Sequence, residues 1–173
     1  STFTLNTATG IQRFHQTVSG EGQGGGIACM NAKADIWNCR FAENKAQGQT
    51  GQGGAINFTN GDILWTHEVS NCLFDGNWAQ ESGGAIAAKV GSSPSVEFCT
   101  FADNTVGEAG GALYIGPNGR ARFSHTIAAG SNGTAVSEDA PADSTFEACL
   151  FYGNLGADYS GALPADTFKA NPR

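Results

Sequence analysis

A short motif recurs along this chain at a nearly constant interval, and that recurrence excludes most folds. The intact copies are IWNCRFAEN at 36–44, VSNCLFDGN at 69–77, VEFCTFADN at 96–104 and FEACLFYGN at 146–154, and FSHTIAAGS at 123–131 is a degraded copy. Glycine-rich turns follow them, as GGAI at 53–56 and 83–86, GGAL at 110–113, GTAV at 133–136 and SGAL at 160–163. The first coil has RFHQ at 13–16 and GGGI at 24–27. A period near 27 residues without helical spacing predicts a β-solenoid, because one coil cannot bury its inner face alone.

The repeats predict an all-β chain, a single-domain parallel β-helix of about six coils over residues 1–173. We expect an N-terminal edge strand at 1–11, repeat coils over 12–163 and a C-terminal tail at 164–173. The intervals from Phe41 to Phe74, Phe101, Ile127 and Phe151 are 33, 27, 26 and 24 residues. The coil after Phe41 is therefore longer than the others.

Three apolar columns are expected to fill the core. They are Ile56, Ile86, Leu113 and Val136; Phe41, Phe74, Phe101 and Phe151, with Ile127 substituting in the degraded coil; and Ile36, Val69, Val96, Phe123 and Phe146. The last two columns are five residues apart and so differ in parity, which requires a bulge or corner between them. The glycine pair before each Ile or Leu is expected to supply positive φ at another corner.

Composition supports this prediction and removes other classes. Glycine accounts for 25 of the 173 residues, and each glycine inside a helix costs about 1 kcal/mol relative to alanine. Nine basic residues against 16 acidic ones leave a formal net charge of −7 and no basic face for nucleic acid. No apolar run is long enough for a membrane span. No CxxC pair occurs and the three histidines lie far apart in sequence, so we expect no metal and no cofactor.

The coupled motifs GGA[I/L/V] and FxxN, here GGAI, GGAI and GGAL with FAEN, FDGN, FADN and FYGN, resemble the polymorphic outer-membrane-protein repeats. The resemblance covers roughly residues 12–163. It implies a right-handed parallel β-helix of the pectate-lyase-like type, exported to a cell surface, in proteins with adhesive or structural roles. It describes the fold better than the function.

Two polar columns are expected to be structural ladders. Asn44, Asn77, Asn104 and Asn154 occupy one corner of successive coils, where stacked amides can bond from rung to rung. A ligand site built from these amides is the alternative. Cys39, Cys72, Cys99 and Cys149 form a column of small side chains that we expect to be free thiols, although neighbouring rungs also bring two cysteines near enough for a bridge.

Many parallel β-helices are polysaccharide lyases or hydrolases, so an enzyme is the alternative to a structural protein. An inverting hydrolase needs two carboxylates about 6.5–9.5 Å apart on one face. The weak catalytic candidates are Glu43, Asp75 and Asp103, which lie in a turn where solvated acids are common. Arg40 is the only cation on a repeated strand, and no calcium-loop spacing occurs.

The longer coil swells at two loops, around 45–52 and 59–67. Insertions in solenoids map to loops that often bind ligands, so a glycan-binding module is a second alternative. The candidate binding residues are Gln47, Gln49, Thr50, Gln52, Asp62, Trp65 and His67. A tolerated insertion with Trp65 packed on the rod is the competing interpretation. Asn57 and Asn132 fit the N-glycosylation pattern, and Asn57 should point outward because it follows the inward Ile56.

Open solenoids expose strand edges at both ends. STFTL at 1–5 predicts an edge strand with Phe3 and Leu5 on one face, while Pro164, Pro172 and the acidic loop at 138–143 give partial protection. The start at Ser1, without a signal-peptide pattern, suits a processed secreted protein or a trimmed piece. We therefore expect a non-catalytic extracellular or cell-surface protein, structural or adhesive. Its expected partners are itself, end to end, and glycans or other cell-surface components.

Overall fold

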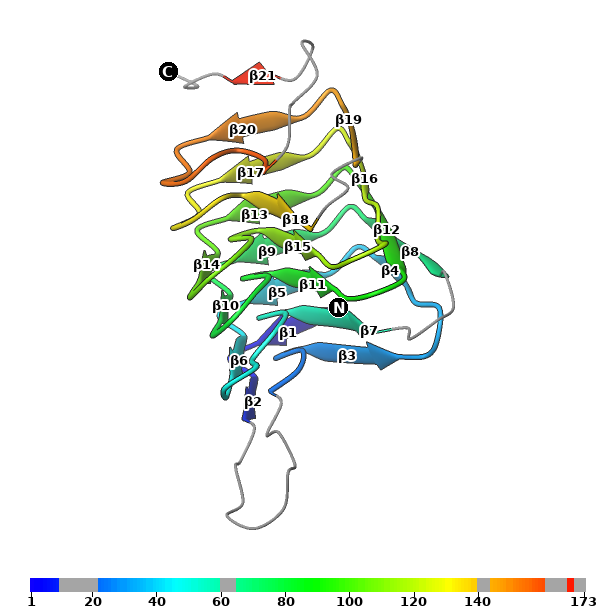
Figure 1. Cartoon of the computed structure of the whole chain (residues 1–173), viewed down its shortest axis with the longest axis vertical. Coiled ribbons are helices and arrows are strands. Elements are labelled where there is room, and N and C mark those ends of the chain that lie inside the picture. Colours follow the sequence, from blue (N-terminus) through cyan, green and yellow to red (C-terminus); the bar gives the residue numbers. More distant parts are fainter. Residues whose placement is uncertain (10–21, 60–64, 140–143, 161–167, 170–173) are drawn as a thin grey trace.

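Short strands stack into a solenoid in the computed structural model of the chain (Figure 1). The structure describes residues 1–9, 22–59, 65–139, 144–160 and 168–169, and these contain strands and turns but no helix. RFHQ at 13–16, Asp62, Pro164, Pro172 and most of SGAL at 160–163 lie outside the described residues. The prediction of an all-β parallel solenoid is confirmed.

The strands form four sheets, which the chain visits in a repeating order, although the last of the four gains no strand after β14. The GGA sheet contains β3 (Ile27–Met30), β7 (Ile56–Thr59), β11 (Ile86–Ala88), β15 (Leu113–Ile115) and β18 (Val136–Glu138). The Val sheet contains β4 (Asp35–Trp37), β8 (Trp65–Ser70), β12 (Ser92–Glu97), β16 (Arg122–Ser124) and β19 (Thr145–Glu147). The Phe sheet contains β1 (Thr2–Thr4), β5 (Arg40–Ala42), β9 (Leu73–Asp75), β13 (Thr100–Ala102), β17 (Ile127–Ala129), β20 (Leu150–Tyr152) and β21 (Phe168–Lys169). The short sheet contains β2 (Thr7–Thr9), β6 (Lys45–Gln47), β10 (Trp78–Ala79) and β14 (Thr105–Val106).

The number of coils is slightly smaller than predicted. The GGA and Val sheets each contain 5 strands, so their first and last strands are separated by about four turns of the chain. The Phe sheet has 7 strands because β1 and β21 extend it at its two ends. The estimate of six coils counted these partial turns as complete ones.

The core consists of apolar columns that run from coil to coil. Ile56, Ile86, Leu113 and Val136 are in register on the GGA sheet, as predicted. On the Phe sheet, the rings of Phe41, Phe74 and Phe101 are stacked face to face with centroids 5.0 and 4.7 Å apart. These rings are almost completely buried. Each Å² of apolar surface removed from water stabilises the fold by about 25 cal/mol.

The degraded coil departs from the predicted column. Ala128, not Ile127, is in register with Phe101 and Phe151, and it is 3% exposed. Ile127 pairs with Thr100 and Leu150 on the outer side of the sheet and is 40% exposed. The prediction for Ile127 is wrong because a shift of one residue along a strand moves the side chain to the other face.

A corner explains the difference in parity between the Val and Phe columns. One residue between each Val strand and the following Phe strand has a positive φ of 50–55°. In successive coils these residues are Asn38, Asn71, Phe98, His125 and Ala148, which we call the corner row. The left-handed conformation of this residue shifts the inward and outward alternation of side chains by one position, as the parity of the two columns requires.

The asparagine column is a ladder of side-chain amides. Asn44 Nδ2 donates to Asn77 Oδ1 at 3.0 Å, and Asn77 Nδ2 donates to Asn104 Oδ1 at 2.9 Å. Asn6, which is not among the predicted ladder residues, extends the ladder by donating to Asn44 at 2.8 Å. Ser131 interrupts it, and Asn154 Oδ1 accepts from the Ser131 backbone instead. Because these buried amides also bond neighbouring backbone, they tie one coil to the next.

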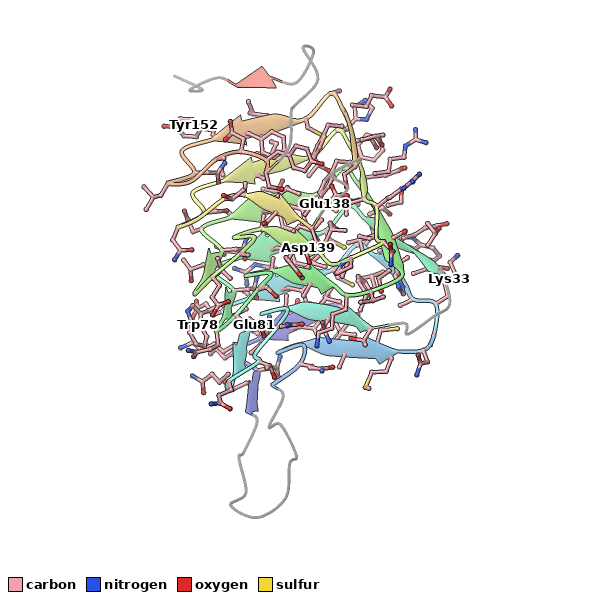
Figure 2. The ribbon with its side chains drawn as sticks, in the orientation of Figure 1. Lys33, Trp78, Glu81, Glu138, Asp139 and Tyr152 are labelled. Carbon is pink, nitrogen blue, oxygen red and sulfur yellow. The ribbon has the colours of Figure 1, made fainter. Side chains whose placement is uncertain are left out.

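A buried carboxylate lies near the C-terminal end of the core. Glu138 ends β18 and is 8% exposed (Figure 2). Tyr159 Oη donates to Glu138 Oε2 at 2.6 Å, and the Ser144 backbone N–H donates to the same oxygen at 3.3 Å. Glu138 is therefore the buried last residue of β18 and not part of the acidic loop predicted at 138–143.

Candidate binding surface

The three acidic candidates for catalysis do not form a converging pair. Glu43 and Asp103 are exposed at equivalent corners, and Gly76 takes this position in the coil between them. Asp75 lies one residue earlier, where its Oδ2 pairs with Arg40 Nη2 at 2.8 Å. The hydrolase hypothesis gains no support from this arrangement, because Glu43 and Asp103 are two coils apart, the Asp103 carboxylate lies over Gly130 of the following coil, and Asp75 is held in an ion pair.

The swollen coil does not present its candidates on one surface. The loop over 45–52 leads from β6 to β7, whereas the loop over 59–67 leads from β7 to β8, at the opposite end of β7. Gln49 is exposed and Gln47 and Thr50 are half-buried, but Gln52 is buried at 7% exposure. The backbone of Trp65 begins β8, which pairs with β12.

His67 belongs to the core. Its side chain is completely buried, and its ring stacks on Phe58 with centroids 4.0 Å apart. The Ala34 backbone N–H donates to Nδ1 at 3.3 Å. Burial lowers the pKa of His67 from 6.5 to about 4, with smaller opposing effects from Asp35, which raises it, and Lys33, which lowers it. A neutral interior imidazole cannot serve as a surface binding group.

The two glycosylation candidates differ in environment. Asn57 is completely buried, and its Nδ2 donates to Gln23 Oε1 and Thr59 Oγ1, both at 3.0 Å. Asn57 alternates with the core residues Ile56 and Phe58, but Gln23 and Thr59 cover it, so this acceptor is not accessible. Asn132 is exposed, although its amide bonds both backbone groups of Val106.

The remaining candidates are placed as follows. All five cysteines are free thiols, and Cys72, Cys99 and Cys149 are buried. Phe3 and Leu5 do not share a face: Phe3 stacks on Phe41 at 4.8 Å, whereas Leu5 has φ 56° and is 67% exposed. Leu5 thus occupies the same kind of corner as Glu43.

The corner row produces a surface that sequence reasoning missed. Asn71 Nδ2 donates to Asn38 Oδ1 at 2.6 Å, and the Phe98 ring stacks on the His125 ring with centroids 4.9 Å apart. Phe98 is 60% exposed, and Trp37, next to the corner on the Val sheet, is 53% exposed. Amides and aromatic rings therefore follow one another along the outside of the solenoid.

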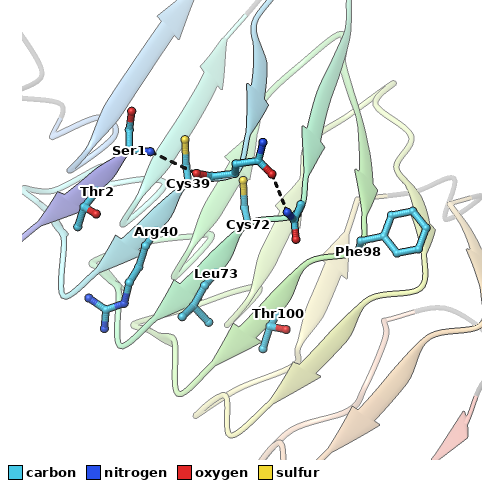
Figure 3. Close-up of a pocket in the computed structure, with 10 residues that line it drawn as sticks. Ser1, Thr2, Cys39, Arg40, Cys72, Leu73, Phe98 and Thr100 are labelled. Carbon is cyan, nitrogen blue, oxygen red and sulfur yellow. Dashed lines mark hydrogen bonds between the residues drawn. The ribbon is translucent and has the colours of Figure 1, made fainter.

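An open hollow of about 580 Å³ lies beside the corner row, which forms one of its sides (Figure 3). On its other side are outward residues of the Phe sheet, with a guanidinium, an aliphatic group and hydroxyls. The lining residues are Ser1, Thr2, Asn38, Cys39, Arg40, Asn71, Cys72, Leu73, Phe98 and Thr100. The lining therefore combines hydrogen-bonding, aliphatic and aromatic groups with one guanidinium.

Phe98 is a costly residue at this position. Bulky residues with positive φ are rare, whereas Asn tolerates that conformation, and the two preceding coils have Asn there. The exposed ring also leaves apolar surface in water. Backbone strain that folding does not repay is a sign of function. The signal was visible in the aligned copies, where Phe precedes Cys in VEFC but Asn precedes it in WNC and SNC.

Known proteins can now be compared with this geometry. Residues 71–89 and 98–116 match the Chlamydia polymorphic membrane protein repeat. Two successive coils of the chain are therefore similar to this repeat. Each matched repeat begins at a corner-row residue, Asn71 or Phe98, and extends through the Asn ladder and the GGA turn into the GGA sheet. No curated protein and no solved structure matches the chain.

Two further findings concern all the residues that the structure describes. In the described ranges, no helix is long and apolar enough to cross a membrane. Among the same residues, no group of three or more His, Cys, Asp or Glu side chains is arranged to hold a metal ion.

Proposed function

We propose that this chain is a surface-exposed, non-catalytic β-solenoid that adheres to a partner through the corner row and the hollow beside it. The exposed Phe98 at a left-handed corner carries the proposal, because stacking on the exposed His125 offsets only part of its cost in stability. The polymorphic membrane protein repeats support a location at a cell surface.

Glycans on another surface are the partner class that this lining favours. Hydroxyl-rich ligands need side chains that donate and accept hydrogen bonds, which Asn38, Asn71 and Thr100 provide. Aromatic rings such as Phe98 add apolar contact beside them. The rigid stacking of coils keeps these groups at the spacing between rungs, so ordering them on binding costs little.

Replacement of Phe98 by Asn tests the proposal. Phe98→Asn installs the residue that preceding coils use, so we expect the fold to be retained and the free energy of unfolding to rise by about 1 kcal/mol. Retention on a panel of immobilised glycans should fall about tenfold or more, as expected for loss of an aromatic anchor. The free energy of unfolding is measured by urea denaturation, and retention is measured by binding of the same variant to the glycan panel.

Leu155→Asn is the matched control, since Leu155 is 83% exposed and lies outside the hollow. It should leave glycan retention unchanged. Unaltered retention by Phe98→Asn would contradict the proposed surface.

We also propose end-to-end association as a second property. In the part of the chain that the structure describes, β1 pairs only with β5 and β21 pairs only with β20, so the Phe sheet has a strand edge at each end. Such edges can add a strand from another copy.

A further inference from the structure

Buried oxygen atoms without hydrogen-bond partners are concentrated on two neighbouring coils. Five of the six such side-chain atoms in the described residues lie there, and Ser131 Oγ is the exception. The five are Thr50 Oγ1, Gln52 Oε1, Asn57 Oδ1, Glu81 Oε2 and Ser82 Oγ. Native structures leave few buried polar atoms unpaired, so such a concentration requires an explanation.

Backbone contacts hold these residues close together. The Glu81 N–H donates to Gly51 O at 2.9 Å, between Thr50 and Gln52 in sequence. Gln52 and Ser82 form a parallel bridge, as do Gln23 and Gln52. Asn57 joins the same group because its Nδ2 donates to Gln23 Oε1. We call these five residues the oxygen cluster.

The swollen turn creates the oxygen cluster. Between β6 and Gln52 the chain makes a turn closed by the Gly51 N–H, which donates to Gly48 O at 3.0 Å. The next coil passes over this turn at Glu81, shortly after Trp78 (Figure 2). Gln52, Asn57 and Ser82 are at most 7% exposed, so the enclosed oxygens have little access to bulk water.

The charge of the oxygen cluster comes from one carboxylate. Glu81 has one oxygen sealed from solvent and forms no ion pair with the described residues. Its field reaches the GGA sheet, where burial, Asp139 and Glu81 together raise the pKa of Tyr114. A partly buried carboxylate without a counter-charge is costly, and a bound cation would offset that cost.

We propose that the oxygen cluster binds a calcium ion. A carboxylate with amide and hydroxyl oxygens is a set of hard ligands, which suits Ca²⁺ better than metals that prefer nitrogen or sulfur. Ca²⁺ accepts six to eight oxygens in flexible geometry, whereas Mg²⁺ keeps several of its waters. One carboxylate gives a weak site, in the range of about 10⁻⁴–10⁻³ M that extracellular calcium modules use.

Thermal unfolding of the whole chain with CaCl₂ or with EGTA tests the site. At about 10 mM Ca²⁺, roughly ten to a hundred times the dissociation constant, mass action should raise Tm by roughly 3–10 °C. MgCl₂ at the same concentration should give a clearly smaller rise. The isosteric variant Glu81→Gln should lose the calcium-dependent rise while keeping the circular dichroism spectrum of the parent protein.

Glu108→Gln is the matched control, because Glu108 occupies the position of Glu81 one coil later and its N–H donates to Glu81 O at 3.0 Å. Glu108 is exposed, and Ala109 replaces the cluster serine beside it. This variant should keep the full calcium response. No rise in Tm for the parent protein, an equal rise with Mg²⁺, or an equal rise in Glu81→Gln would overturn the proposal and leave ordinary hydration of the cluster as the explanation.

Discussion

At the scale of single residues, His67 shows how the solenoid uses a titratable side chain as a core group. The imidazole stacks on Phe58 and accepts the Ala34 N–H at Nδ1, so the proton of the neutral ring is on Nε2. Protonation of Nδ1 would remove this hydrogen bond and place a charge in the interior. Burial therefore keeps the pKa near 4, below its ordinary 6.5.

This shift predicts a loss of stability in mild acid. Between pH 6.5 and about 4 the unfolded chain binds a proton that the folded chain does not, so stability is full above pH 6.5 and falls as the pH decreases. The slope from this residue is at most about 1.4 kcal/mol per pH unit. Urea unfolding at pH 7 and pH 5 measures it.

His67→Gln should reduce the difference in the free energy of unfolding between pH 7 and pH 5, because Gln is neutral at both pH values. His125→Gln should not, since His125 is exposed. An unchanged difference in His67→Gln would refute the role of His67.

At the scale of the elements, the two glycines of each GGA turn have different tasks. The first has positive φ, 66° at Gly53, 67° at Gly83 and 74° at Gly110. The second lets coils approach closely: a Cβ on Gly54 would lie 2.0 Å from Gly84 O, and one on Gly84 would lie 2.2 Å from Gly111 O. Only the first task was predicted from the sequence.

Gly54→Ala should therefore destabilise the protein strongly. The obstructing atom is the backbone oxygen of Gly84 in the next coil, which cannot move without disturbing the backbone hydrogen bonds between coils. We expect a loss of about 3 kcal/mol or more, from overpacking of a rigid site. Gly133→Ala is the comparison, because its Cβ would make an ordinary contact of 3.5 Å with Val106 Cγ1. Similar unfolding free energies for the two variants would disprove this account.

The sequence predicts some elements of the structure better than others. The GGA column and the corner before the Phe sheet followed from period and parity, since strands alternate strictly. Ala128 was missed because a degraded copy offers no phenylalanine to mark the register. The burial of Asn57 depends on a side chain from another coil, which alternation within β7 does not reveal. Alignment of the copies does not predict the role of Phe98, because that role depends on how this residue differs from the Asn of the two preceding coils.

At the scale of the whole molecule, charge and strand edges act against each other in the proposed end-to-end association. The net charge of −7 makes copies repel one another, while the edge of β1 offers backbone groups for pairing. Salt screens the repulsion over about 10 Å at 0.1 M. Sedimentation velocity should therefore show a mass that grows with concentration, and more so at high salt.

Thr4→Pro separates edge pairing from other association. The N–H of Leu5 bonds Ala42 O, and Arg40 bonds Ser1 O, so alternate residues of β1 face β5 and the Thr4 N–H points to the free edge. The proline should suppress assembly while β1 stays paired with β5. A monomer at every concentration, or assembly unaffected by Thr4→Pro, would exclude pairing through β1.

The Asn ladder has a consequence for how such chains change length. Each rung bonds a neighbour of the same kind, from Asn6 through Asn44 and Asn77 to Asn104. A gene that gains or loses one complete repeat therefore leaves every remaining coil with an equivalent neighbour, whereas a partial repeat moves inward side chains outward. Recombination between repeats can vary the reach of the rod in whole coils without inventing a new core.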